Sequence, residues 1–486
     1  MKGEFYILNV DRIMNILKTM KSLLLQRDKA DIPVTQRPIL PALAILSFPI
    51  IVGELMQLAY KLVDTLWVGR LGTEELAAMS FAFPIIFVVI SLGAGFSISG
   101  SALVSQYTGA EQSDQANHAA GQVLIFGTSI STFLTILGLL YGRSALQMLG
   151  PEPEVLELAW AYFRILCAAI PLIFIYFIFQ ATYRAIGDTV TPMLIKLFSV
   201  GLNVILDPLL IFGIGPFPYL GITGAAWATV FSRLLATIIG LYLLFTSYRG
   251  GLHLQTHHLI PDFQVILKII KIGAPAAASM TALALARTFM TGIVGSFGTA
   301  TMAAWGVVNR VMSVFRLPAM GTSRATTILV GQHLGAHQVP RAEKTAWTST
   351  AVTFGSLFAL GLVGLLVAPF IITIFDSTPD VVRIGTEYLR IAIFAYVFLG
   401  IQQVLCGGLR GAGNTVEDAA IRIITQWGMQ IPFAYYLSSI FGRIGIWWAV
   451  LLSYFLGAGL SIVWFRRGTW QETVIDDPTP ETGEFD

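Results

Sequence analysis

Two polar residues interrupt an otherwise apolar segment in the first half of the sequence. Residues 199–213 read SVGLNVILDPLLIFG, in which Asn203 precedes Asp207 by one helical turn and Pro208 follows the acid directly. A carboxylate costs free energy when it leaves water, so an acid kept in an apolar segment points to a function. Such a group can take up and release a proton, and with neutral oxygens beside it can hold a hard cation such as Na⁺. The proline removes a backbone donor, which leaves an acceptor in the preceding turn free to face the ion.

A second acid, Asp64, lies in the first long apolar segment, with Tyr60 one turn earlier on the same helical face. Counted from the expected ends of their helices, the two acids both lie roughly 10 Å inside the membrane. The sequence therefore predicts one ion- or proton-coupling pocket, formed by Tyr60, Asp64, Tyr162, Asn203, Asp207 and Thr229. The candidate Na⁺ ligands within it are Asp64, Asn203, Asp207 and Thr229.

Each of these residues also has a purely structural interpretation. Lys61 is three residues from Asp64, so the two can form a salt bridge within one helix. Asp207 and the proline after it can end a helix near the membrane surface, where tyrosines are also common. Asn203 can join two helices, and Thr229 can bond to its own helix backbone.

Other polar residues give weaker signals. Glu54 lies near the centre of the first apolar segment and is a candidate second ion or cation-substrate contact. His257 and His258 form a loop pair with no further ligand nearby, so we expect no metal there. Cys167 and Cys406 both lie in apolar runs and read as buried free thiols.

The composition is that of a membrane protein. Of the 486 residues, 55% are hydrophobic and only 12% are charged, and the mean hydropathy is +0.73. A spanning helix needs roughly 20 apolar residues, and the chain has many such runs rather than the alternating pattern of a barrel. A net charge of +2 without a basic cluster gives no reason to expect a nucleic-acid partner. No GxxxxGK[ST] motif for nucleotide hydrolysis occurs.

The apolar runs predict an all-α polytopic protein with twelve transmembrane helices. Their approximate spans are 38–68, 76–105, 116–142, 156–183, 190–214, 220–246, 264–294, 302–331, 343–370, 383–409, 416–440 and 444–465. With both termini placed inside, the inner segments hold 18 Lys and Arg and the outer loops hold four. The positive-inside rule therefore predicts that both termini are cytoplasmic.

The two halves of the chain repeat each other at an offset of 226 residues. SQYTGA ends at Ala110 and GQHLGA at Ala336, while YRAIGDT begins at Tyr183 and LRGAGNT at Leu409. Six spans per repeat give parallel halves, which in transporters bind substrate between them and alternate access by rocking. The repeat predicts an N-terminal segment 1–36, an N-lobe 37–250, a C-lobe 251–466 and an acidic tail 467–486.

The repeat fails where the candidate pocket lies. Asp64 corresponds to Met290, Asn203 to Met429, and Asp207 to Phe433. Positions that maintain the scaffold are expected to repeat, whereas a site needed once is not. This asymmetry favours an ion site in the N-lobe alone.

Several stretches together resemble the multidrug and toxic compound extrusion family. They are FPIIVGELMQLAYKLVDTLWVGRLGTEELAA, GSALVSQYTGA, FQATYRAIGDT, NVILDPLLIFG, GITGAAWAT, GQHLGA and GLRGAGNT, and the resemblance spans roughly residues 36–466. It implies two pseudo-symmetric six-helix lobes around a V-shaped central cleft. Asp64, Tyr60, Asn203 and Asp207 match the branch with its ion site in the N-lobe, and Pro49 matches a helix-bending proline of that branch.

The resemblance also implies the function. We expect a secondary antiporter, not an enzyme, that exports drug-like, cationic or amphipathic organic compounds in exchange for H⁺ or Na⁺, without a cofactor. It would be a monomer in the plasma (inner) membrane. The alternative is a lipid-linked oligosaccharide flippase of the same superfamily, for which Arg287, Arg310 and Arg316 could supply a cationic cleft.

Overall fold

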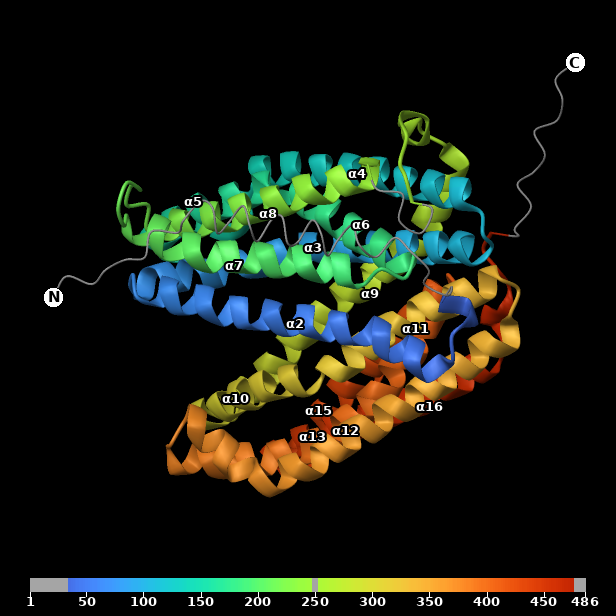
Figure 1. Ribbon diagram of the computed structural model, residues 1–486. Helices are drawn as coiled ribbons and strands as arrows, with labels where there is room; N and C mark the ends of the chain where they lie inside the picture. The colour runs from blue at the N-terminus through green and yellow to red at the C-terminus, as the bar shows by residue number, and fades with distance from the viewer. Residues whose placement is uncertain (1–33, 247–251, 476–486) are drawn as a thin grey trace, which may run out of the picture.

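The computed structural model describes residues 34–246 and 252–475, and these residues are almost wholly helical. Figure 1 shows two groups of helices, which we call the N-lobe and the C-lobe. The N-lobe contains α2 (Ile39–Gly69), α3 (Thr73–Gly109), α4 (Ser113–Gln147), α5 (Pro153–Ala168), α6 (Ile170–Ala185), α7 (Val190–Phe212) and α8 (Ile222–Thr246). A short helix, η1 (Val34–Gln36), precedes it.

The C-lobe begins after a connecting segment that contains η3 (Thr256–Leu259). Its helices are α9 (Phe263–Gly295), α10 (Thr299–Phe315), α11 (Leu317–Gly335), α12 (Val339–Phe375), α13 (Pro379–Gly411), α14 (Thr415–Ile423), the π-helix η4 (Ile424–Gln430), α15 (Ile431–Phe441), α16 (Arg443–Arg466) and η5 (Thr469–Gln471).

The twelve predicted spans map onto these elements. Among the described residues, nine single helices are long and apolar enough to cross a membrane, and α5 with α6 forms a tenth span bent by 47°. The other two spans are α10 with α11, and α14 with η4 and α15. The last helix of each divided span carries a proline at its second position: Pro171, Pro318 and Pro432. A proline lacks the N–H that would continue the preceding helix, which accounts for the breaks.

Each lobe has its own packed core. In the N-lobe, Phe163 and Phe174 are buried between helices, and in the C-lobe Trp447 stacks on Tyr388 with ring centroids 4.0 Å apart. Many large apolar side chains on the outer helix faces, such as Leu140 and Leu366, are exposed. Such faces suit lipid rather than water.

The two lobes meet at one end, here called the closed end, and diverge toward the other, the open end (Figure 1). At the crossing, α3 packs on α9 and α2 packs on α11. A Cβ on Gly95 would collide with Ala277, and a Cβ on Gly321 would collide with Ile51. Gly321 follows Gly95 by 226 residues, as Ala277 follows Ile51, so the crossing is reciprocal.

The closed end is fastened by a second reciprocal set. Gln106 Nε2 donates to the Gly411 carbonyl at 3.0 Å, and Gln332 Nε2 donates to the Ala185 carbonyl at 2.7 Å. These are again residues 226 apart. Gly109 and Gly335 allow the approach, because a Cβ on either would strike the backbone of the opposite glutamine. The repeat seen in the sequence is therefore a physical two-fold contact.

The predicted acidic tail is not free over its whole length. Trp470 is fully buried and stacks on Phe465 at 4.5 Å. The Val474 amide donates to Gln106 Oε1 at 3.0 Å, across the lobe boundary. Trp470 and Val474 explain the difference, because they precede the acidic stretch that begins at Asp476. Residues 476–486 and most of the predicted segment 1–36 lie outside the described residues.

Candidate functional site

Asp64 and Asp207 lie on adjacent helices of the N-lobe, α2 and α7. Their exposed fractions are 5% and 0%. Each carboxylate lies within electrostatic range of the other, since the charge of Asp64 acts on Asp207. Two buried acids from separate helices therefore lie close together in the N-lobe.

Neutral oxygens surround the two acids. The Tyr60 hydroxyl is 3.0 Å from Thr229 Oγ1, so α2 and α8 are joined beside Asp64. With its amide oriented to satisfy both polar atoms, Asn203 donates from Nδ2 to Asp207 Oδ2 at 3.0 Å, and its oxygen accepts from the Thr229 amide at 3.1 Å. The Asn203 side chain therefore connects Asp207 to Thr229, the residue that also contacts Tyr60.

Tyr162, from α5, completes the set. It is 6% exposed, and the charges of Asp64 and Asp207 both act on its hydroxyl. The structure thus brings together all six residues that the sequence nominated for the pocket. Four helices position them, and all belong to the N-lobe.

The purely structural roles considered for the two acids, a salt bridge for Asp64 and a helix end for Asp207, are not found in the structure. Lys61 makes no ion pair with Asp64 and instead lies over the Phe83 ring, 5.8 Å from its centroid. Within the described residues, buried Asp64 Oδ1 has no hydrogen-bond partner. Asp207 does not end a helix, because α7 continues through Pro208 to Phe212. An unsatisfied buried oxygen leaves room for a proton or a cation.

Glu54 belongs to a different cluster, which sequence reasoning missed. Its Oε1 accepts from Lys196 Nζ of α7 at 3.0 Å and from Arg324 Nη1 of the C-lobe at 2.7 Å. Because two cations already share this carboxylate, Glu54 is poorly placed to take a cationic ligand. The partner Arg324 is 270 residues away, so no local sequence pattern could have revealed the pair.

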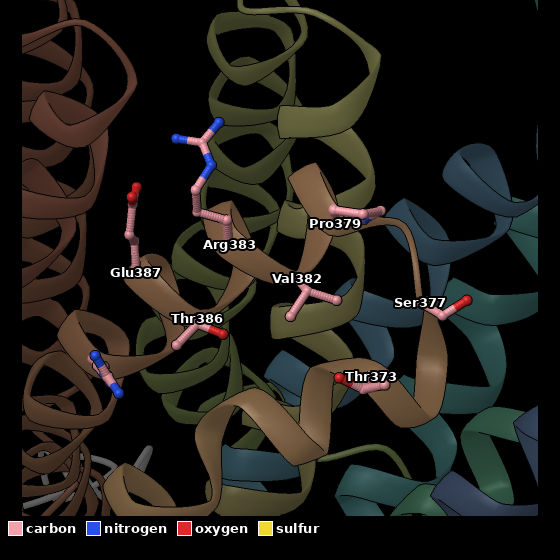
Figure 2. A pocket seen from close by; sticks show the side chains of 8 residues that line it. Thr373, Ser377, Pro379, Val382, Arg383, Thr386 and Glu387 are labelled. Atoms are coloured by element: carbon pink, nitrogen blue, oxygen red, sulfur yellow. The ribbon is translucent and has the colours of Figure 1, made fainter.

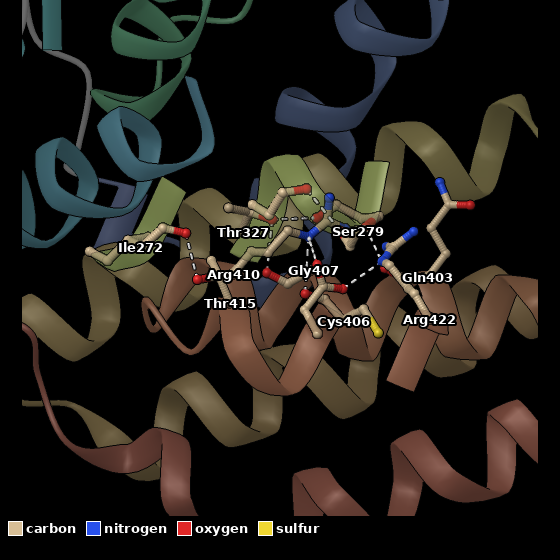
Figure 3. Close-up of polar contacts among 12 residues, drawn as sticks. Ile272, Ser279, Thr327, Gln403, Cys406, Gly407, Arg410, Thr415 and Arg422 are labelled. Atoms are coloured by element: carbon tan, nitrogen blue, oxygen red, sulfur yellow. Dashed lines mark hydrogen bonds and ion pairs between the residues drawn. The ribbon is translucent and has the colours of Figure 1, made fainter. Parts of the chain in front are cut away.

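The C-lobe holds a counterpart of this cluster (Figure 3). Buried Asp418 accepts from Arg422 Nε at 2.7 Å and lies 3.8 Å from Arg410 Nε. Arg410 also donates to Ser323 Oγ at 3.0 Å. Arg410 and Arg422 correspond to Arg184 and Lys196 by the 226-residue offset. The charge of Arg184 also acts on Glu54, so each lobe holds an equivalent pair of cations near one acid, which indicates a structural role.

The histidine pair in the connecting segment has a third neighbour, contrary to the sequence expectation. Asp114 Oδ1 is 3.1 Å from His258 Nε2 and 4.0 Å from His257 Nε2. However, His258 Nδ1 accepts a hydrogen bond from the Gln255 amide at 3.0 Å. That fixes the proton on Nε2, where it is donated to Asp114, so His258 has no lone pair left for a metal.

A groove of about 590 Å³ lies at the open end of the C-lobe, between the end of α12 and the start of α13 (Figure 2). Two of its charged side chains are already paired. Arg383 Nη2 lies 3.0 Å from Asp380, and Glu387 lies 3.5 Å from Arg443. The groove lies away from the lobe crossing, so it is a weaker candidate site than the N-lobe pocket.

Comparisons with known proteins agree with this architecture. The chain is 28% identical over 416 residues to "Probable multidrug resistance protein YoeA" of Bacillus subtilis, covering 83% of this chain and 89% of the relative. It is 25% identical to "Multidrug export protein MepA" of Staphylococcus haemolyticus, covering 84% and 89%. It is 29% identical to the "FAD transporter" of Shewanella oneidensis, covering 84% and 90%.

Two solved structures are similar over nearly their full length. One is described as the outward-facing conformation of a multidrug resistance MATE family transporter of the MOP superfamily; its TM-score is 0.85 at 25% identity, covering 90% of this chain and 98% of that one. The other is a MOP superfamily transporter from Pyrococcus furiosus, with a TM-score of 0.85 at 25% identity, covering 92% and 100%.

A family model settles the assignment. The MatE model matches residues 49–209 and 275–436, one stretch in each lobe and together more than half of the chain. Those stretches include both reciprocal crossings and the two acids of the N-lobe. The chain is a multi-pass membrane transporter, not an enzyme, and it belongs to the MatE family.

Proposed function

We propose that this transporter is an antiporter that exports amphipathic organic compounds in exchange for H⁺ or Na⁺, and that the N-lobe pocket is its coupling site. The observation that carries this proposal is the pair of buried acids, Asp64 and Asp207, neither of which is neutralised by a described cation. Buried carboxylates without a counter-charge are costly, so they are retained where they bind something.

The pocket suits either ion. A proton on one carboxylate would neutralise a buried charge, and Asn203 can meet both protonation states because an amide both donates and accepts. For Na⁺, the carboxylates of Asp64 and Asp207 would supply charge, while Asn203 and Thr229 would supply neutral oxygens. The unpartnered Asp64 Oδ1 is the atom most open to the ion.

Helix α2 offers a route from ion binding to movement of the lobes. It carries Asp64 toward the open end and crosses α11 at Ile51. Pro49 lies between the crossing and the helix start, where the missing N–H permits bending. Ion binding at Asp64 would therefore change how α2 meets the C-lobe, which is the requirement for alternating access.

The names of the relatives and the distribution of Lys and Arg support a substrate class and a membrane topology. Relatives named for multidrug resistance and multidrug export support small organic substrates. We place both termini in the cytoplasm of a cell whose plasma membrane holds the protein as a monomer. The lobes would be 37–250 and 251–466, and the end at which they diverge would face the outside in this conformation.

A second candidate, a lipid-linked oligosaccharide flippase, rests on the basic residues of the C-lobe. Arg287 and Arg310 are exposed and Arg316 is half-buried, and none of them is ion-paired within the described residues. Because a flippase of a lipid pyrophosphate needs such charges but no coupling acid in the N-lobe, the experiment below distinguishes the two functions.

The test is dye efflux from proteoliposomes, with a proton gradient and a sodium gradient imposed separately. Wild-type protein should export dye under at least one gradient. Asp207→Asn removes the charge but keeps the shape, so it should lose gradient-driven efflux by roughly tenfold or more, the effect of about 1.4 kcal/mol. Arg143→Gln, an exposed change at the open end, is the control. Undiminished efflux by Asp207→Asn would contradict the proposed coupling site.

A further inference from the structure

Four basic side chains converge on the space between the lobes from both sides. Lys61 of α2 lies ten residues beyond Ile51 of the crossing, and Arg287 of α9 lies ten residues beyond Ala277. At 1.5 Å per residue, both stand about 15 Å from the crossing toward the open end. They are 226 residues apart, so they occupy equivalent positions in the two lobes, and the charge of Arg287 acts on Lys61.

The other two cations flank this pair. Arg233 of α8 donates to Gln57 Oε1 at 3.2 Å, one turn before Lys61 on α2. Arg316 stands at the break between α10 and α11, five residues toward the open end from Gly321. The charges of Arg233, Arg287 and Arg316 all act on Lys61, which places the four groups in one neighbourhood.

None of the four is neutralised by the described parts of the protein. Lys61 and Arg233 lie over aromatic rings, of Phe83 at 5.8 Å and Tyr176 at 5.1 Å, rather than beside a carboxylate. Buried Arg316 Nε has no hydrogen-bond partner there. Glu54 is the acid whose charge acts on Lys61, but its carboxylate is already paired with Lys196 and Arg324.

Like charges gathered between the two lobes repel one another and attract an anion. Arginine in particular matches the planar geometry of a carboxylate or phosphate. We propose that Lys61, Arg233, Arg287 and Arg316 form a binding site for an organic anion that bears a carboxylate or phosphate. This inference deepens the proposed function, on which it rests, by naming the substrate class. It departs from the cationic substrates that the family resemblance implied.

Aromatic groups beside the cations define the rest of the ligand. Tyr396 and Tyr454 lie edge to face, with ring centroids 6.0 Å apart, and both are in electrostatic range of Arg287. They favour a ligand with an aromatic or apolar body next to its anionic group. Because Lys61 and Arg233 belong to one lobe and Arg287 and Arg316 to the other, a single bound anion would link the two lobes.

The test compares two dyes of one skeleton and opposite charge, fluorescein and its cationic rhodamine counterpart. Binding to the purified full-length protein in detergent is measured by fluorescence polarisation, which needs no ion gradient. Fluorescein should bind at least about tenfold more tightly than the rhodamine, and its affinity should fall with added salt. Lys61→Gln and Arg287→Gln should each weaken fluorescein binding several-fold. Arg443→Gln, a cation paired with Glu387 at the open end, should not.

Two competitors distinguish the sources of the anion. Displacement of fluorescein by phenyl phosphate identifies a soluble aromatic anion, and displacement only by short-chain phosphatidic acid identifies a lipid. Tighter binding of the rhodamine, or fluorescein binding that Lys61→Gln and Arg287→Gln leave unchanged, overturns the assignment. Melting temperatures of the variants confirm that each is folded.

The two proposals fail separately. Asp207→Asn should still bind fluorescein, because the acid lies outside the basic site, while it loses gradient-driven efflux. If the anion site is wrong, efflux of other dyes through the N-lobe acids is unaffected. If the coupling site is wrong, fluorescein binding is unaffected.

Discussion

At the scale of single residues, the N-lobe pocket depends on a few short polar contacts. The Tyr60 hydroxyl and Thr229 Oγ1 join α2 to α8 at 3.0 Å, and Asn203 joins Asp207 to the same threonine. Thr229 is therefore the residue at which the two acid-bearing helices are tied to a third. It looked like the weakest member of the pocket in the sequence, because a helix threonine often bonds its own backbone.

Thr229→Val keeps the shape of the side chain and removes the oxygen. Tyr60 then loses its partner, and the pocket loses one possible ion ligand. A net hydrogen bond of about 0.5–1.5 kcal/mol predicts a roughly two- to thirteenfold rise in the ion concentration that gives half-maximal efflux. Thr65→Val is the matched control, since Thr65 is exposed and its hydroxyl donates to the Lys61 carbonyl of its own helix. Equal shifts in the two variants would argue against a role for Thr229.

The members of the pocket could be predicted because helical rise is regular, so depth follows from residue counts. The ionic partners could not. Spacing of three residues allows a bond between Lys61 and Asp64, but in the fold Lys61 lies over Phe83. Glu54 finds its partners 142 and 270 residues away; the packing of α2 on α7 decides the first and the docking of the lobes decides the second.

At the scale of elements, the number of spans was predictable and their internal breaks were only partly so. Pro171, Pro318 and Pro432 mark where three spans divide, and each proline is visible in the sequence. The π-helix η4 has no comparable residue signal. The π-helix also does not coincide with the one change in the repeat, because the offset is still 226 between Asp207 and Phe433 and becomes 224 only between Gly221 and Gly445.

The start of α9 offers a test that lies outside the membrane. Asp262 caps this helix through the amides of Gln264 and Val265, and His118 is 3.0 Å from its other oxygen. Partial burial raises the pKa of Asp262, but the bonds from His118 and the two amides outweigh it, so the pKa lies below the ordinary value of 3.8. The stability from this group is therefore present above pH 3.8 and is lost as the pH falls through the lower folded value.

Asp262→Ala should lower the free energy of unfolding at pH 7 by about 0.5–2 kcal/mol, because the cap is removed. Asp262→Asn keeps a good cap and should cost less. The advantage of the wild type over Asp262→Asn should shrink below pH 3.8, as the carboxylate is protonated. Thermal unfolding in detergent across pH measures both effects. Identical melting temperatures for the two variants at pH 7 would contradict the capping role.

At the scale of the whole molecule, the two lobes touch through pairs of equivalent residues. Gln106 and Gln332 make the same bond in opposite directions, beside Gly109 and Gly335. The repeat in the sequence predicted two related halves, but it could not show that the repeated motifs themselves are the contact. The difference in polarity between the halves could be predicted from the sequence, because two acids and one amide of the N-lobe correspond to methionine or phenylalanine in the C-lobe.

Gly335→Val should disfavour the closed end. Its added side chain would strike the Gln106 backbone, and overpacking of this kind costs about 1–3 kcal/mol, enough to shift a two-state equilibrium roughly five- to hundredfold. In a Ser105→Cys reporter, whose side chain is fully buried at this contact, a water-soluble maleimide should react correspondingly faster. Gly306→Val is the control, because a Cβ there meets nothing within 4 Å. Equal labelling rates would refute the role of this contact.

The reciprocal crossing has a consequence for how such a molecule can arise. Each half carries both surfaces of the contact, so a six-helix chain would pair with a copy of itself through an isologous interface. Joining the two copies into one polypeptide preserves the interface and frees each half from having to be its own partner. One half can then lose its acids, as Met290 and Phe433 show, while the other keeps them. An acidic pocket in one lobe without a counterpart in the other is thus available only to the fused form.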